Sequence, residues 1–454
     1  MSVGCEKTID MTRGEPLGLI VRFSLPLLVG NAFQQLYNMV DSWVVGKFVG
    51  TTALAAVGIA FPVVFLLSSL FIGLSIGASV MIAQFIGSED KDAVRRGVNT
   101  VYGAFMVSIV PLTIFGLVIA GPMLRLIQVP ENVYAQAHIY LLVVFAGIIG
   151  SLGYNINAGI LQGLGDSRTP LLFLAVACVI NTVLDLVFVL VLHWDVFGVA
   201  FATIIAQISS WLFGIRYVNR KYHDFSIQPF RLAVEKRLLR RVLRLGVPSG
   251  IQQCQLAVAI LVLQALINSF GEQFAAGFSA ANKIDTFAFM PIDSFALAVT
   301  TYVGQNVGAG QMDRVKNGVR KALVLCIVVC AVMSALVVPN GALFLSIFSS
   351  DPAVIQAGQA YLVRVLSTMV LLAIMYPLNN ALRGAGAVVT PMVSNIVALW
   401  AARVPAAYLL AHFYGKEALY WSYPIGWVLG ILISGTVYLR GRWKRVCTAA
   451  RITE

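Results

Sequence analysis

Apolar and polar residues alternate along this chain in long blocks. Apolar stretches of roughly 20 or more residues, the length that crosses a bilayer, are separated by short segments rich in charged residues, glycine and proline. Lipid cannot satisfy free backbone N–H and C=O groups, so each stretch must be a helix, and the alternating pattern of a membrane barrel is absent. The pattern predicts twelve helices, at about residues 18–45, 53–84, 97–120, 134–156, 169–192, 197–218, 240–268, 274–304, 318–339, 353–378, 389–411 and 418–439.

The second half of this pattern repeats the first, displaced by about 221 or 222 positions. The clearest match aligns LQGLGDSRTP (161–170) with LRGAGAVVTP (382–391). Two repeats with an even number of spans share one topology, an arrangement common in transporters. We therefore expect an all-α polytopic membrane protein with two pseudo-symmetric six-helix lobes. Its predicted parts are an N-terminal segment (1–16), an N-lobe (17–218), an inter-lobe linker (219–239), a C-lobe (240–439) and a C-terminal tail (440–454).

The composition is that of a membrane protein, which means that the net positive charge has to be interpreted by its position along the chain. Of 454 residues, 59% are hydrophobic and 11% charged, and the mean hydropathy is +0.85, which excludes a disordered chain and a conventional soluble enzyme. The net charge of +12 does not predict a nucleic-acid partner, because the basic residues flank the apolar stretches. Most of the 32 Lys and Arg fall on one set of alternate loops, which predicts that the linker and both termini are cytoplasmic in a multi-pass protein of the plasma membrane.

Charged residues inside the predicted spans are the candidates for function, because they are costly at membrane depth and usually face a cavity or a partner. The first span carries one polar stripe on an otherwise apolar helix, formed by Gln34, Tyr37, Asn38 and Asp41 with neighbouring amide and hydroxyl residues. Such a stripe is either a seam of hydrogen bonds between helices or part of a site. The carboxylate at its end favours a site.

Two further spans of the N-lobe bring polar groups to a similar depth. Asn181 and Asp185 share one helix face, and Thr203 descends in the next span. Counted from the predicted outer boundary, Asp41, Asp185 and Thr203 lie about 9 to 12 Å deep. Their oxygens suit a bound Na⁺, a proton shared by a coupled acid pair, or a purely structural network. The C-lobe has no equivalent, since Leu263 and Ala406 or Ala407 stand at the repeated positions, so we expect the coupling ion in the N-lobe.

The eighth predicted span carries two further acids, Asp285 and Asp293, which are eight residues apart and roughly share a face. They either line a cleft and contact a cationic substrate or form structural ion pairs with Arg364 and Arg403. Tyr376 and nearby Met and Phe residues are compatible with an adaptable apolar cavity. The role of Lys283, which points away from the two acids, stays open.

Taken together, these features resemble the bacterial multidrug and toxic compound extrusion (MATE) family. The resemblance is carried by the two six-span repeats, by PLLVGNAFQQLYNMVDSWVVGKFVG with its aspartate, by AQFIG and GQNVG, and by the paired glycine-rich turns. It implies a cation site at Asp41, Asn181, Asp185 and Thr203, and cavity-lining roles for Tyr37, Asn155 and Asn157. A second acidic pattern that some members carry is absent, since this chain has Gln255, Gln264, Tyr376 and Asn379 there.

The function expected from the residues and the resemblance is secondary active efflux of cationic, amphipathic small molecules in exchange for H⁺ or Na⁺, by alternating access. We expect a monomer in the lipid bilayer that has no cofactor beyond the coupling cation and is not an enzyme. A lipid-linked oligosaccharide flippase of the wider superfamily is the alternative, and the acidic N-lobe argues against it. An intramembrane enzyme would need an HExxH, a paired-Asp metal motif or a Ser/Lys pair, which the sequence lacks.

Overall fold

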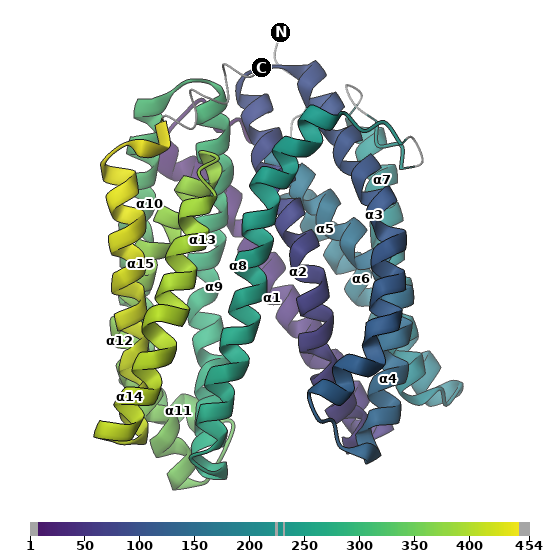
Figure 1. The fold of residues 1–454 in the computed structure, drawn as a ribbon, viewed down its shortest axis with the longest axis vertical. Coiled ribbons are helices and arrows are strands. Elements are labelled where there is room, and N and C mark those ends of the chain that lie inside the picture. Colours follow the sequence, from purple (N-terminus) through teal and green to yellow (C-terminus); the bar gives the residue numbers. More distant parts are fainter. Residues whose placement is uncertain (1–7, 223–225, 230–231, 445–454) are drawn as a thin grey trace. The chain divides into compact units, whose positions relative to one another are not determined.

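The computed structural model describes residues 8–222, 226–229 and 232–444, and all regular elements in these ranges are helices (Figure 1). Eleven of these helices are long and apolar enough to cross a membrane, and one bent pair supplies a further span. The predicted all-α polytopic fold is therefore confirmed. The first seven residues of the predicted N-terminal segment, part of the predicted linker and residues 445–454 of the predicted tail lie outside the described residues.

The chain divides into two compact units, and the division falls inside two long helices. Among the described residues, unit 1 contains 8–10 and 25–254 and unit 2 contains 11–24 and 255–444, so α1 and α8 each contribute to both units. The helices up to the division are α1 (Pro16–Val44), η1 (Val45–Val49), α2 (Thr51–Gly87), α3 (Lys91–Leu126), α4 (Glu131–Ala146), α5 (Ile148–Gly163), α6 (Arg168–Leu186), η2 (Val187–Val191), α7 (Asp195–Lys221) and α8 (Lys236–Asn268).

Unit 2 continues from the second part of α8 and has a core of its own. Its large buried side chains include Phe274, Tyr361 and Tyr420. Its helices are α9 (Glu272–Gly308), α10 (Met312–Val337), α11 (Gly341–Ser346), α12 (Pro352–Gly384), α13 (Val389–Ile396), η3 (Val397–Arg403), α14 (Val404–Tyr414), η4 (Lys416–Trp421) and α15 (Ser422–Leu439).

The fourth predicted span is broken where the sequence predicts one helix over 134–156. It consists of α4 and α5, bent by 52° at Gly147. A Cβ atom built on Gly147 would lie 2.3 Å from the side chain of Ile204 on α7, and one on Gly150 would lie 2.6 Å from the backbone N of Ile208. The glycines therefore let α5 approach α7 closely, and the chain bends where that approach begins.

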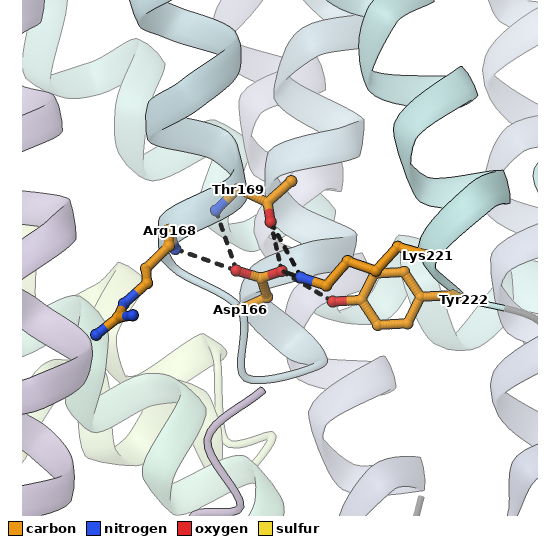
Figure 2. Close-up of polar contacts among 5 residues, drawn as sticks. All are labelled: Asp166, Arg168, Thr169, Lys221 and Tyr222. Carbon is orange, nitrogen blue, oxygen red and sulfur yellow. Dashed lines mark hydrogen bonds and ion pairs between the residues drawn. The ribbon is translucent and has the colours of Figure 1, made fainter. Parts of the chain in front are cut away.

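The turn between α5 and α6 is fixed by one buried carboxylate, Asp166 (Figure 2). It accepts hydrogen bonds from the backbone N–H of Arg168 and Thr169 and from the Thr169 hydroxyl, and so caps the start of α6. Lys221 at the end of α7 forms an ion pair with it at 2.5 Å, and the Tyr222 hydroxyl donates to it at 2.9 Å. Burial raises the pKa of Asp166, but the hydrogen bonds from Lys221 and Thr169 outweigh this and hold the pKa below its ordinary value.

Candidate functional site

Unit 1 brings together the two carboxylates that the sequence placed at similar depth. Asp41 on α1 and Asp185 on α6 are close enough to share a hydrogen bond when one of them carries a proton. Asp185 is fully buried, and neither of its carboxylate oxygens has a hydrogen-bond partner among the described residues; the same holds for the buried Oδ1 of Asp41. Two adjacent carboxylates without a counter-ion in a low-dielectric interior cannot both stay ionised. The pair therefore needs a proton or a cation.

Polar groups from three helices surround the carboxylate pair. Asn181 on α6 is buried and donates a hydrogen bond of 3.4 Å to the Thr203 hydroxyl on α7, and Thr203 donates at 3.0 Å to the carbonyl of Val199. The Tyr37 hydroxyl is within hydrogen-bonding reach of Thr203 and lies near both carboxylates. The four predicted coupling residues and Tyr37 therefore lie in one place, where hydroxyl and amide oxygens supplement the carboxylates.

Apolar side chains cover one side of this site, and we call them the valine seal. The seal consists of Val44, Val45, Ala53, Val189, Val196 and Val199, all buried. Val45, Val189 and Val199 each lie one helical turn from a polar residue of the site, Asp41, Asp185 and Thr203 respectively. The helical segments that supply the polar groups, joined by Ala53 of α2, thus also supply the apolar cluster beside the site.

A π-helical turn begins within four residues after each carboxylate. Asp41 is followed by η1 (Val45–Val49) and Asp185 by η2 (Val187–Val191), and residues of both turns belong to the valine seal. A π-helical turn leaves the regular hydrogen-bond ladder of an α-helix and is frequent at functional sites. Neither turn was predicted, because the apolar pattern runs through both of them without a break.

Tyr140 is a member of the site that was not among the predicted residues. It lies on α4, near both Asp41 and Asp185, and packs against the valine seal. It directly precedes the apolar run LLVVFA, which completes α4. A tyrosine at the edge of an apolar run is a weak sequence signal for a functional residue. Tyrosine is common at membrane interfaces, so the residue type alone does not identify a member of a site.

The other predicted N-lobe residues form hydrogen bonds away from the carboxylate pair, two of them within their own helix and one between helices. Gln34 donates to Asn38 on the same helix at 3.3 Å, and Asn155 donates to the carbonyl of Ser151. Asn157 is fully buried and accepts a hydrogen bond from Tyr102, while its amide donates to the Trp211 carbonyl at 3.2 Å. Asn157 therefore lies in the packed interior between α3, α5 and α7, where it joins these helices.

In unit 2 the two predicted acids have separate surroundings. Asp285 on α9 accepts a hydrogen bond of 3.1 Å from the Tyr361 hydroxyl and is electrostatically near Arg403. Asp293, two turns further along α9, has Tyr376 and Arg383 as charged or polar neighbours. The acids thus face different arginines.

The membrane-embedded cations of unit 2 also differ in their contacts. Arg364 forms an ion pair of 2.9 Å with Glu417, and the guanidinium of Arg403 stacks 3.4 Å from the ring centre of Tyr423. Lys283 is exposed and lies over the ring of Phe348 at 5.4 Å. At the repeat positions of Asp41 and Asp185, Leu263 and Ala407 are buried in the apolar core. The pair of adjacent carboxylates is therefore a feature of the first repeat.

The comparison with known protein families decides the family. A family model described as MatE matches residues 26–187 and again residues 248–409, which together exceed half of the chain. The chain belongs to the MatE family. The two matched ranges are displaced from each other by the same number of positions as the internal repeat. The predicted duplication and the family resemblance are therefore both confirmed.

Relatives of this MATE chain match it over nearly their whole length. It is 30% identical to "Probable multidrug resistance protein YpnP" of Bacillus subtilis over 96% of this chain and 98% of the relative. It is 26% identical to "Probable multidrug resistance protein NorM" of Thermotoga maritima over 96% and 95%. A crystal structure of MATE in complex with MaL6 matches with a TM-score of 0.89 and 25% identity, over 96% of this chain and 99% of that one. The MATE chain is thus a multi-pass membrane transporter and not an enzyme.

Proposed function

We propose that this chain is a multidrug efflux antiporter that exports cationic, amphipathic small molecules in exchange for H⁺ or Na⁺ by alternating access. The names of its relatives support multidrug export, since the proteins of Bacillus subtilis and Thermotoga maritima are named as probable multidrug resistance proteins. The observation that carries the coupling is the pair Asp41 and Asp185, which lie side by side with unpartnered, buried oxygens.

The carboxylate pair supports ion coupling for an electrostatic reason. In the described part of the chain, no Lys, Arg or His forms an ion pair with Asp41 or Asp185. One bound H⁺ or Na⁺ removes the repulsion between the two carboxylates, and its loss restores that repulsion. The free energy of unit 1 therefore depends strongly on whether the ion is bound, as a coupled transporter requires.

The valine seal supports a cycle in which access to the carboxylates changes. While the seal is shut, a cation cannot reach Asp185 from that side without crossing apolar side chains, which is costly. Opening the seal admits the ion, and the bound ion favours a different arrangement of the helices. In our proposal this side faces outward, so that an ion entering from outside drives the release of substrate.

Substrate binding is proposed for polar and aromatic residues of both units, of which Tyr37 also borders the carboxylate pair. In unit 1 these are Gln34, Tyr37, Asn38 and Asn155; the buried position of Asn157 suits a positioning role instead. In unit 2 they are Asp285, Asp293 and Tyr376, of which the two acids supply negative charge for a cationic substrate. The ring of Phe289 packs edge-on against Tyr376 at 4.9 Å, which provides an aromatic surface.

The test is uphill efflux of a fluorescent cationic dye from proteoliposomes, with proton and sodium gradients imposed separately. Wild-type protein should export the dye under at least one gradient. Asp41→Asn keeps the size of the side chain but removes the charge, so efflux should lose its dependence on the gradient while the melting temperature is retained.

The matched control is Asp313→Asn, the same chemical change at a side chain that is 97% exposed. It should leave dye export unchanged. Gradient-driven uphill export by the Asp41→Asn variant would overturn the assignment of the coupling site. A wild-type protein that responds to neither gradient would overturn the antiporter proposal itself.

A further inference from the structure

A pocket of about 380 Å³ lies at the end of α7 that carries Lys221, away from the carboxylate pair. Five of its six lining residues come from one face of α7, and the sixth is Pro229 of the segment that follows the helix. The lining residues are Leu212, Ile215, Arg216, Asn219, Arg220 and Pro229. The helical residues recur every three or four positions, so they form one continuous stripe.

This stripe changes from apolar to basic at the depth where a membrane ends. Arg216 lies 21 residues after Asp195, the first residue of α7, which corresponds to about 32 Å along the helix axis. The hydrocarbon core of a bilayer is about 30 Å thick. Leu212, which is 53% exposed, therefore faces the acyl chains, while Arg216 and then Arg220 reach the headgroup region.

The wall opposite the helix is held by a specific pair of hydrogen bonds. The Asn219 side chain donates to the carbonyl of Ile227 at 2.8 Å and accepts from its backbone N–H at 2.6 Å. Ile227 is 2% exposed. The segment 226–229 is thereby folded back against α7, and Pro229 borders the pocket.

The two arginines of the pocket have no acidic partner among the described residues. The neighbouring Lys221, in contrast, is bound by Asp166 at 2.5 Å (Figure 2). Arg216 and Arg220 are both exposed, and they are four residues apart on one helix face. Two guanidinium groups in this arrangement can donate several hydrogen bonds to one phosphate group, with the geometry that arginine favours.

We propose that this pocket binds the headgroup of an anionic phospholipid. Arg216 and Arg220 hold the phosphate, and the first acyl carbons lie against Leu212 and Ile215. A free phosphate would use the arginines alone, whereas the apolar half of the stripe matches a ligand that is itself charged at one end and apolar at the other. Basic pockets at the membrane boundary bind lipid headgroups on this principle. The inference does not depend on the proposed ion coupling.

The test is native mass spectrometry of the purified full chain after titration with phosphatidylglycerol, and in parallel with phosphatidylcholine. Wild-type protein should retain phosphatidylglycerol in preference to phosphatidylcholine. Each arginine contributes roughly fivefold in affinity near an anionic headgroup, so Arg216→Gln with Arg220→Gln should weaken retention roughly 25-fold.

The control double variant is Arg237→Gln with Arg240→Gln, at the start of α8. It removes the same charge from two exposed arginines that do not line the pocket, and should change retention less than about twofold. An equal loss of phosphatidylglycerol retention in both double variants would overturn the proposal, because it would indicate that the lipid is held by the general positive charge of the surface and not by this pocket. Displacement of phosphatidylglycerol by millimolar inorganic phosphate would overturn the proposal that the ligand is a phospholipid.

Discussion

Two glycine pairs allow α2 and α8 to cross almost backbone to backbone. Gly73 and Gly77 on α2 face Gly250 and Gly246 on α8 respectively. A Cβ atom on Gly73 would lie 2.2 Å from the backbone N of Gly250, and one on Gly77 would lie 2.6 Å from the backbone N of Gly246. Small residues four apart are a common means of close helix packing in membranes. We therefore predict that Gly73→Ala destabilises unit 1.

The size of the effect follows from that distance. Ordinary contacts of a Cβ atom begin at 3.4 Å, so the helices would have to separate by roughly 1.2 Å at a point where backbone meets backbone. Overpacking of this kind costs about 1 to 3 kcal/mol. Alanine regains up to about 1 kcal/mol through its higher helix propensity. With the full gain in helix propensity, the net loss in the free energy of unfolding should be about 0 to 2 kcal/mol.

The control lies in the same helix. A Cβ atom on Gly58 of α2 would meet no neighbouring atom of the described residues within 4 Å, so Gly58→Ala should raise the stability by up to about 1 kcal/mol. The measurement is thermal unfolding of both variants in detergent, followed by tryptophan fluorescence and by elution in size-exclusion chromatography. A melting temperature of Gly73→Ala at or above that of Gly58→Ala would refute the reasoning.

Two further predictions concern the Asp166 cluster and the valine seal. Asp166→Asn replaces the buried carboxylate that pairs with Lys221 by a neutral amide. This change should cost about 3 kcal/mol of unfolding free energy, as measured in thermal melts. The folded pKa of Asp166 lies below its ordinary value, so the stability difference between the wild type and Asp166→Asn is complete above about pH 4 and is lost as the pH falls through the folded pKa. A stability difference that persists unchanged in acid would contradict the ion-pair explanation. Val189→Ser should wet the seal and increase passive ion leak into proteoliposomes several-fold, as read by an entrapped pH- or sodium-sensitive dye. Val191→Ser, in the same π-helical turn but 68% exposed, is the control, and equal leak in both variants would argue against a seal at Val189.

The hydrophobic pattern was sufficient to predict the helices, because lipid leaves the backbone no alternative to a helix in each long apolar stretch. It failed at Gly147, where the break depends on how closely α5 approaches Ile204 of another helix. Such an approach is a property of the packed structure. The pattern likewise gives no sign of η1 and η2, because a π-helical turn uses the same apolar residues as an α-helical one.

The site was predictable as far as charge and depth could determine it. Asp41 and Asp185 are costly in a membrane, and their similar depth indicated that they could belong to one site. Tyr140 escaped notice because a tyrosine hydroxyl costs far less than a carboxylate and thus signals function weakly. The amide of Asn157 suits a cavity, but the choice between a cavity and a packed interior depends on Tyr102 and Trp211, which lie far from it in sequence.

The valine seal has a consequence for the free-energy balance between the closed and open forms of the proposed cycle. Valine has a single side-chain torsion that is already restricted by its branched Cβ, so ordering it costs little conformational entropy. A closure built from leucine or methionine would lose more rotamer freedom each time it formed. In the proposed cycle, closing a seal with five valines among its six residues therefore costs little entropy, which keeps the closed and open forms close in free energy and lets the binding of one small cation shift the balance between them.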